Sequence, residues 1–171
     1  MTWKASALGL LALAAGLASW WMMSPHYQRL PDFSLPDLSG ELRTAREWRG
    51  EVLVLNFWAT WCKPCRKEIP MLASVQEEFA QRGLQIVGVA IDKPAPVRRF
   101  SEQFEIRYPV LVDALGAARL QDDLGGGQGI PYTVVVDPRG RVRHTVAGAL
   151  EREQLIDMIT PLLPIRPRSG L

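Results

Sequence analysis

The amino-acid sequence predicts an α/β fold in which helices flank a central mixed β-sheet. Two apolar runs, 52–58 and 84–90, have the length and composition of buried strands. The segment between them repeats apolar residues at helical spacing, which predicts a right-handed parallel β-α-β unit. Two later stretches, 134–136 and 141–147, are separated by the turn sequence Asp137-Pro138-Arg139-Gly140. We therefore expect the second of them to return antiparallel to the first.

The chain has 171 residues, with 20 Lys and Arg against 18 Asp and Glu, and a formal net charge of +2. This length fits one globular domain with a sizeable core and an appendage. Because the charges nearly balance, nothing indicates a nucleic acid or an acidic ligand as a partner. We assign residues 31–164 to the domain and residues 165–171 to a frayed tail.

The appendage lies at the N-terminus. Residues 5–23 contain no charged side chain, and Lys4 precedes them. A helix over this run would span roughly 28 Å, close to the thickness of the hydrocarbon core of a bilayer. Trp20 and Trp21 suit the membrane interface, and the positive charge on the N-terminal side favours a cytoplasmic location for that end.

We therefore expect an uncleaved transmembrane anchor over residues 1–24, followed by a polar linker over 25–30. A cleaved signal peptide is the alternative, because Gly16-Leu17-Ala18 resembles a small-residue cleavage site. The apolar run continues beyond Ala18, which favours the anchor. In both interpretations the domain is exported. An oxidisable cysteine pair is suited to the oxidising compartments outside the cytoplasm.

A small β-hairpin is expected ahead of the first core strand. The segments 33–35 and 42–44 flank Leu38-Ser39-Gly40-Glu41, whose Ser-Gly pair favours a turn. Residues 45–49 then form a short connection, and Gly50 lets the chain turn into the strand.

The only two cysteines of the sequence, Cys62 and Cys65, stand between the first core strand and the helix that Gly83 ends. The strand delivers Cys62 to the helix N-terminus, where unpaired N–H groups and the helix dipole favour a thiolate over a thiol. Lys63 adds a positive charge, and Pro64 already has the shape of a first helical turn. A nucleophilic sulfur with a partner one turn away indicates a redox-active pair.

A structural disulfide and a zinc half-site are the alternatives for this pair. A loop this short removes little chain entropy, roughly 2 kcal/mol, and strained short-loop disulfides are the labile kind. A zinc site would need further ligands, but there is no second Cys-x-x-Cys, and His26 and His144 are far away in sequence. The redox interpretation is therefore favoured, and it requires neither a metal nor a cofactor.

Helices and strands continue to alternate after the second core strand. A helix beginning at Pro94, a short strand over 108–112 and a helix over 117–124 follow. The glycine run 125–127 has no Gly-Lys-Ser/Thr and no helix after it, so we interpret it as a flexible approach to the next strand rather than a phosphate loop. Apolar residues at helical spacing over 155–163 predict an amphipathic closing helix.

Trp61-Cys62-Lys63-Pro64-Cys65, with Pro70 five positions after the second cysteine, resembles the active-site helix of the thioredoxin superfamily. Within that superfamily, residues 55–62 and Arg66-Lys67-Glu68 are similar to the membrane-anchored TlpA/ResA/CcmG-like branch. The similarity runs from about residue 31 to residue 163. It implies a thioredoxin-like fold that carries an N-terminal β-hairpin and a helical insertion.

Gly129-Ile130-Pro131 resembles the thioredoxin cis-proline loop, which packs against the Cys-x-x-Cys helix. An X–Pro bond is the only kind that adopts the cis form readily. The resemblance implies that a cis Pro131 turns the backbone of Ile130 towards Cys62 and offers its N–H and C=O groups to an extended substrate. An ordinary trans turn is the alternative.

The two cysteines have separate expected roles. Cys62, at the exposed start of the helix, attacks the substrate disulfide, and Cys65, one turn inside, resolves the mixed disulfide. Thioredoxins place a buried aspartate six residues before the first cysteine, but Asn56 stands there in this chain and cannot take a proton. The resemblance implies Glu68 as the replacement that tunes the thiols. The alternative is a solvated glutamate favoured by the helix dipole.

The neighbouring side chains have supporting roles in this prediction. Trp61 directly precedes the first cysteine, so we expect it to form part of the substrate surface and to shield the sulfurs. Trp58 is expected to pack, and Arg66-Lys67 to lie on a solvated face. The Lys63-Pro64 pair is expected to set thiolate stability and thereby the direction of electron flow.

We predict a thiol–disulfide oxidoreductase that is anchored by one span, residues 5–23, in the cytoplasmic membrane of a bacterium. Its catalytic domain would be on the periplasmic side and would act on cysteines or disulfides of client proteins. The resemblance implies a reductant that is recharged by a membrane thiol-electron donor of the CcdA/DsbD type, with cytochrome c maturation as one destination for the electrons.

Two other function classes are alternatives. A thiol peroxidase usually has Pro-x-x-x-Thr/Ser-x-x-Cys, whereas Leu55 and Ala59 stand at those positions before Cys62. A non-enzymatic copper-handling protein of the same fold would use Cys-x-x-x-Cys with a distal histidine, and the sequence has neither in that arrangement.

Overall fold

The computed structural model describes residues 27–164, so the predicted anchor over 1–24 and the predicted tail over 165–171 lie outside the described residues. No helix within 27–164 is long and apolar enough to cross a membrane. The strands are β1 (Ser34–Pro36), β2 (Leu42–Thr44), β3 (Val52–Trp58), β4 (Leu84–Ala90), β5 (Val110–Val112), β6 (Tyr132–Val136) and β7 (Val142–Ala147). The helices are α2 (Lys63–Phe79), α3 (Pro94–Gln103), α4 (Ala114–Asp123) and α5 (Arg152–Ile159), with short 3-10 turns η1 (Ala45–Trp48), η2 (Ala80–Arg82) and η3 (Thr160–Leu162).

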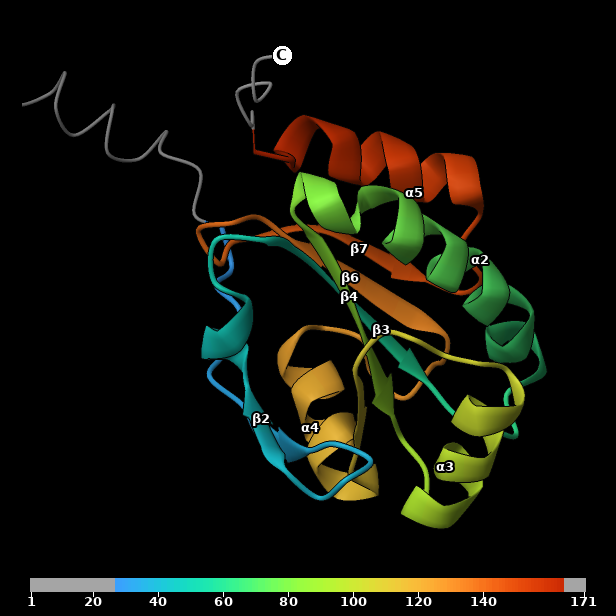
Figure 1. Cartoon of the computed structure of the whole chain (residues 1–171). Coiled ribbons are helices and arrows are strands. Elements are labelled where there is room, and N and C mark those ends of the chain that lie inside the picture. The colour runs from blue at the N-terminus through green and yellow to red at the C-terminus, as the bar shows by residue number, and fades with distance from the viewer. Residues whose placement is uncertain (1–26, 165–171) are drawn as a thin grey trace, which may run out of the picture.

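A five-stranded mixed sheet forms the centre of the domain, in the order β5-β4-β3-β6-β7 (Figure 1). β3 runs parallel to β4, with Val52 opposite Leu84 and Trp58 opposite Ala90, and antiparallel to β6. β5 is parallel to β4, and β7 is antiparallel to β6. The predicted β-α-β unit, the antiparallel return and the mixed sheet are therefore confirmed, and β1 and β2 pair separately as the predicted hairpin.

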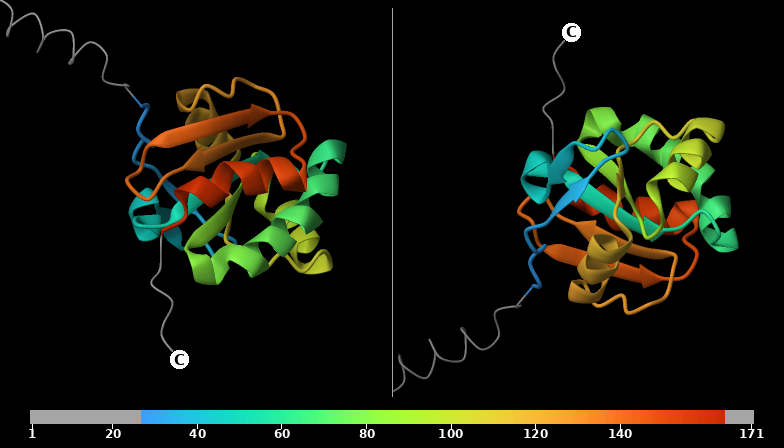
Figure 2. Two further views of the ribbon diagram at one scale, coloured as in Figure 1. Left: turned by 90° about the horizontal axis from the view of Figure 1, so that it is seen from above. Right: turned by 90° about the horizontal axis from the view of Figure 1, so that it is seen from below.

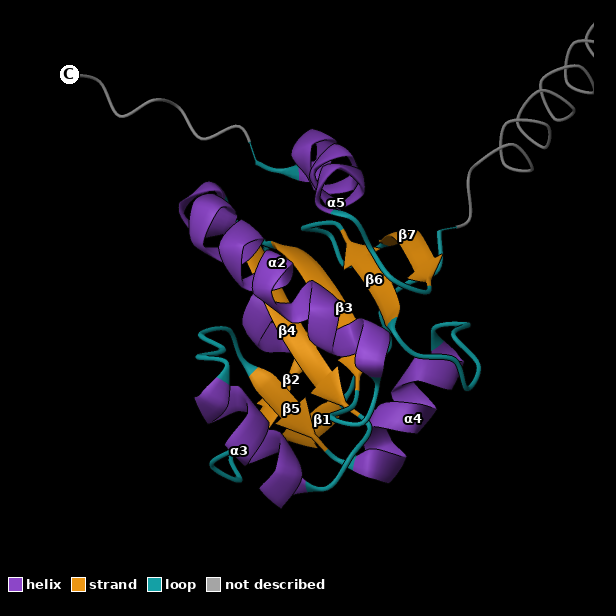
Figure 3. Cartoon of the chain, turned by 90° about the vertical axis from the view of Figure 1, so that its right-hand side faces the viewer, coloured by secondary structure: helices purple, strands orange, loops and turns teal. Residues whose placement is uncertain are grey.

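Helices cover both faces of the sheet, so β3 is buried along its whole length (Figures 2 and 3). Val52, Val54 and Trp58 lie in the core shared with α2, α3 and α5. Odd-numbered side chains from Leu53 to Phe57 lie in a second core with α4 and the hairpin. Because side chains alternate along a strand, Asn56 belongs to the face that α2 covers.

Two element boundaries differ from the sequence prediction because of side-chain caps. α4 begins at Ala114, three residues before the predicted start, since Asp113 Oδ1 accepts the N–H groups of Leu115 and Gly116 at 3.1 Å each. Residues 45–48 form the 3-10 turn η1 rather than a plain connection, and Thr44 and Glu47 cap it reciprocally.

The chain before β1 is held against the end of the sheet where β7 begins (Figure 2). The Leu30 N–H donates to the Gly140 carbonyl at 2.9 Å, and the Val142 N–H donates to the Gln28 carbonyl at 2.8 Å. The Gln28 side chain also donates to the Asp123 carbonyl at 2.7 Å. Residues 28–30, which fall in the linker predicted over 25–30, therefore belong to the folded domain. Hydrogen bonds between backbone groups do not depend on the pattern of side chains, so the polar sequence of this segment could not predict its pairing with the sheet.

Gly88 provides a test of the packing beneath the first cysteine. A Cβ at this position would lie 2.9 Å from Trp58 Nε1 and 3.3 Å from Tyr108 Cε2. Both rings are buried and cannot move aside, so we expect Gly88→Ala to lower the free energy of unfolding by about 1–3 kcal/mol. Chemical denaturation measures this change. Gly129→Ala is the control, because a Cβ there meets nothing within 4 Å, and an equal loss in both variants would contradict the packing argument.

Candidate active site

The N-terminus of α2 carries a disulfide between Cys62 and Cys65, with an S–S distance of 2.02 Å and a Cα–Cα distance of 5.3 Å. Cys62 is the N-cap residue of α2, and its Sγ accepts the N–H of Cys65 at 3.3 Å. β3 ends at Trp58 and delivers the chain to this position, as the sequence predicts. The sulfur therefore occupies the place where a helix end favours negative charge.

The exposure of Cys62 is smaller than the sequence prediction of an exposed helix start. Only 4% of Cys62 is accessible, against 0% of Cys65. The physical reason is that the Cys62 sulfur is turned inward, where it caps the helix and bonds to Cys65. The order of the two residues is as predicted, because Cys62 is slightly accessible and Cys65 is not.

The loop between β3 and α2 is fixed by Asp92, a residue that the sequence analysis did not single out. Asp92 Oδ2 accepts the Thr60 N–H at 3.0 Å and the Thr60 hydroxyl at 2.6 Å, and Oδ1 accepts the Lys93 N–H at 2.7 Å. Burial alone would raise the pKa of Asp92, but these hydrogen bonds outweigh it and lower the pKa below its ordinary value. The Asp92 carboxylate, just after the end of β4, thus fixes the loop at Thr60 that leads to the cysteines.

The side chains around the disulfide divide into buried and exposed groups. Trp58 is fully buried, whereas Trp61 is 69% exposed, which agrees with the predicted packing and rim positions. Lys63-Pro64 and Arg66-Lys67 are exposed, and the Arg66 guanidinium lies 5.6 Å from the centre of the Phe100 ring. An exposed indole next to the cysteine gives this end of the domain an apolar contact surface.

The Ile130–Pro131 peptide bond is cis, as expected from the sequence. Pro131 is buried at the start of β6, and the half-buried Ile130 packs against the core that includes both cysteines. Within residues 27–164 the N–H and C=O of Ile130 have no hydrogen-bond partner. The glycine run before it is not the loose approach that the sequence predicted. The buried Gln121 amide donates to the carbonyls of Gly126, Gly127 and Gly129 at 2.8–3.3 Å.

Glu68 is buried on α2, three residues after Cys65, with 4% of its surface exposed, so it is not the solvated glutamate of the alternative interpretation. Its Oε1 accepts the Asn56 side-chain amide at 2.8 Å, and its Oε2 accepts the Leu150 N–H at 3.0 Å. The same amide also donates to Thr133 Oγ1 at 3.1 Å. Asn56 cannot take a proton, but it positions the carboxyl group that can.

The surroundings of Glu68 favour its neutral form. Burial raises the pKa of Glu68 above its ordinary value, although the bonds from Leu150 and Asn56 oppose this effect. Burial, together with the charge of Glu68, also raises the pKa of Tyr108, whose hydroxyl has no partner among the described residues. A raised pKa makes the Glu68 carboxylate a stronger base than an ordinary glutamate, which suits a group that exchanges protons.

A groove of about 690 Å³ gives solvent a route towards this carboxyl group. It lies between the first turns of α2 and the segment 149–152 that enters α5, and Glu68 is among its lining residues with Lys63 and Lys67. The sequence could not indicate the groove, because Leu150 is 82 residues away from Glu68. The one indication in the sequence of a buried polar partner at this place is Asn56, a polar residue in an otherwise apolar strand.

A thioredoxin-like fold with a Cys-x-x-Cys pair at a helix N-terminus defines the class of this protein as a thiol–disulfide oxidoreductase. Known proteins agree with this class. The chain is 30% identical over 138 residues to the thiol-disulfide oxidoreductase ResA of Geobacillus thermodenitrificans, covering 78% of this chain and 76% of that protein. It is 35% identical over 138 residues to the thioredoxin-like protein YneN of Bacillus subtilis, covering 77% and 78%.

Solved structures show the same relationship. A thiol:disulfide interchange protein of Chlorobium tepidum superposes with a TM-score of 0.75 at 29% identity, over 82% of this chain and 99% of that one. A putative thiol:disulfide interchange protein DsbE of the same species has a TM-score of 0.73 at 29% identity, over 81% and 97%. The chain belongs to the AhpC/TSA family, whose family model matches residues 27–145.

The buried carboxyl group makes a testable contribution to stability. As pH rises above about 4.5, the ordinary pKa, the unfolded chain releases the Glu68 proton before the folded protein does. The free energy of unfolding therefore falls with rising pH, until Glu68 also ionises in the folded state, by about 1.4 kcal/mol for each tenfold difference in acidity. Glu68→Gln removes this contribution.

Denaturation of the oxidised protein between pH 4 and pH 8 measures the effect. We expect the stability of Glu68→Gln relative to wild type to increase with pH over this window. Glu102→Gln, which removes one carboxyl group at an exposed helical position, is the matched control. A constant difference for Glu68→Gln would contradict the raised pKa.

Proposed function

We propose that this protein is a reductant of client-protein disulfides that is tethered to the membrane on its export side. The proposal rests on one observation: the start of α2 carries both the Cys62–Cys65 pair and, one turn further along, a buried and hydrogen-bonded Glu68. The cysteine pair provides thiol–disulfide exchange, and Glu68 provides a proton acceptor for the Cys65 thiol. The resemblance to the TlpA/ResA/CcmG-like branch favours the reducing direction.

The reaction begins from the dithiol form. The Cys62 thiolate attacks one sulfur of the client disulfide, a new S–S bond forms, and the other client sulfur leaves as a thiolate. Cys65 then loses its proton and attacks the Cys62 sulfur. The bond from Cys62 to the client breaks, and the second client sulfur leaves as a thiolate. The client gains two electrons, the enzyme loses two, and the Cys62–Cys65 disulfide of this structure is the product.

Glu68 assists the second step by accepting the proton of Cys65. It lies three residues after Cys65 on α2, a spacing that brings two side chains to one helix surface. Its raised pKa makes its carboxylate a stronger base than an ordinary glutamate, and the adjoining groove lets the proton reach solvent. Asn56 is the positioning residue, because its amide fixes one oxygen of the carboxyl group.

The client binds across the rim formed by Trp61 and Ile130. Trp61 supplies exposed apolar area beside Cys62. The N–H and C=O of Ile130, which have no partner among the described residues, pair with an extended client backbone. Lys63 and Pro64 tune the thiolate at the exposed turn of the helix. Specificity for a particular client then depends on the residues beside its cysteine.

The predicted span over 5–23 would hold the domain at the periplasmic face of a bacterial cytoplasmic membrane. The support is the uncharged run with Lys4 before it and two tryptophans at its far end. In that place a membrane thiol-electron donor of the CcdA/DsbD type can return the enzyme to the dithiol form. Cytochrome c maturation is one destination for the electrons that the CcmG-like resemblance implies.

Trapping the mixed disulfide tests the assignment of the two cysteines. Cys65→Ser should accumulate a covalent complex with a disulfide-bonded protein such as insulin, because the attack occurs but the resolution does not. Cys62→Ser should accumulate none. Non-reducing electrophoresis measures the complex, and Glu68→Gln should slow its resolution in the otherwise intact enzyme. Trapping through Cys65 in the Cys62→Ser variant would reverse the assignment.

The reduction potential of the pair tests the direction of the reaction. Equilibration of the full chain in detergent with dithiothreitol or glutathione can be followed by the fluorescence of Trp58 and Trp61. We expect a potential near or below about −220 mV, as for reductants of this fold. A value near about −120 mV would identify an oxidant of the DsbA type, and the absence of a reversible two-electron transition would exclude exchange altogether.

A further inference from the structure

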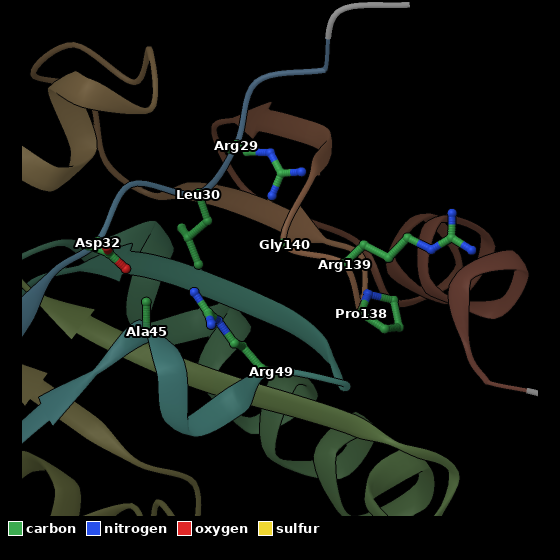
Figure 4. A pocket seen from close by; sticks show the side chains of 8 residues that line it. All are labelled: Arg29, Leu30, Asp32, Ala45, Arg49, Pro138, Arg139 and Gly140. Carbon is green, nitrogen blue, oxygen red and sulfur yellow. The ribbon is translucent and has the colours of Figure 1, made fainter.

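An arginine-lined hollow of about 470 Å³ lies at the end of the sheet opposite the cysteines (Figure 4). Arg49 stands just before β3, and Pro138 to Gly140 form the turn that leads out of β6. Cys62 follows the other end of β3, and Pro131 precedes the other end of β6. Because β3 and β6 are antiparallel neighbours, the hollow and the active site mark the two ends of the same strand pair.

The hollow carries unneutralised positive charge. Arg29, Arg49 and Arg139 are exposed, and none of them forms an ion pair with a residue of the described range 27–164. Asp32 is the carboxylate in the lining, and it pairs with Arg46 at 3.5 Å. Figure 4 shows the Arg29 and Arg49 side chains entering the hollow from opposite sides.

Two guanidinium groups on either side of a hollow match the chemistry of a phosphate group. Each guanidinium group presents a planar set of N–H donors that can bind two oxygens of one phosphate at once. Leu30 lies between them in the lining and gives the hollow one apolar wall. A phosphate attached to an apolar group fits this combination better than a bare anion does.

The chain itself brings this end of the domain to the membrane. Tyr27 lies 5.2 Å from the Arg141 guanidinium and 4.8 Å from that of Arg143, measured to the ring centre, and Gln28 is paired with Val142. The residues from 23, the last of the predicted span, to 28 reach at most about 18 Å when fully extended. The hollow therefore lies near the bilayer surface if residues 5–23 form the anchor, and in this respect the inference rests on the proposed function.

We propose that the hollow binds the phosphate of an anionic phospholipid headgroup through Arg29 and Arg49, with Arg139 at its rim. The negative surface potential of an anionic bilayer attracts basic groups within a Debye length, and the short connection to the anchor holds the arginines within that range. The contact orients the domain so that Cys62 points away from the bilayer.

Hydrogen exchange of the full chain in nanodiscs tests this proposal. Discs of phosphatidylcholine alone are compared with discs that also contain phosphatidylglycerol. In the anionic discs we expect slower exchange in peptides covering 27–32, 45–50 and 137–141, with no change at 58–68. The triple variant Arg29→Gln/Arg49→Gln/Arg139→Gln should lose this protection, and high salt should remove it from the wild type.

The matched control is Arg98→Gln/Arg99→Gln/Arg119→Gln, which removes the same charge from exposed positions on α3 and α4 and should keep the protection. Equal protection by inorganic phosphate in neutral discs would assign the hollow to a soluble anion and overturn the lipid proposal. Unchanged exchange in anionic discs would also overturn it. Insulin reduction by the same discs reports the proposed function separately, and a chain that does not insert into discs would contradict the anchor and the proposal together.

Discussion

The pair of hydrogen bonds to the Glu68 carboxyl group is the constraint on which the active-site end of this domain depends. A buried ionisable group is costly unless its oxygens are bonded, and here one oxygen is held by β3 and the other by the segment before α5. The first turns of α2 are thereby fixed against the sheet on one side and the closing helix on the other. Cys62 and Cys65 belong to those same turns, so the position of the disulfide follows from the position of the carboxyl group.

The same constraint explains why Asn56 is compatible with thiol–disulfide chemistry. A proton acceptor beneath the inner cysteine can come from the strand or from the helix, provided that it is buried beside the helix N-terminus. In this chain α2 contributes the buried carboxyl group of Glu68, which we propose as that acceptor, and the strand contributes an amide that donates to it. An aspartate at position 56 would place two carboxyl groups against each other, and like charges at such a distance disfavour ionisation of both.

Local patterns predicted most of the fold, because strands and helices here bury regular apolar faces. The runs around Leu53 and Ile86 are nearly unbroken, and the cysteines stand at a strand-to-helix junction that is visible in sequence. The pattern failed where side chains act at long range. The Gln121 side chain donates hydrogen bonds to carbonyl groups of the glycine-rich segment that the sequence predicted to be flexible. The Leu150 N–H that donates to Glu68 belongs to a segment 82 residues further along the chain. Such contacts depend on tertiary packing and have no period.

The two ends of the β3–β6 pair impose opposite requirements on the domain. A seven-residue strand is roughly 23 Å long, so when the strand pair stands upright on a bilayer with the arginines at its surface, the disulfide lies well above that surface. In the proposed function, clients approach best when the disulfide points away from the membrane, whereas the proposed membrane donor would need the disulfide to turn towards it. The proposed headgroup contact through exposed arginines would meet both needs, because such contacts are screened and exchange readily. A large apolar interface with the membrane would fix one orientation and prevent half of the catalytic cycle.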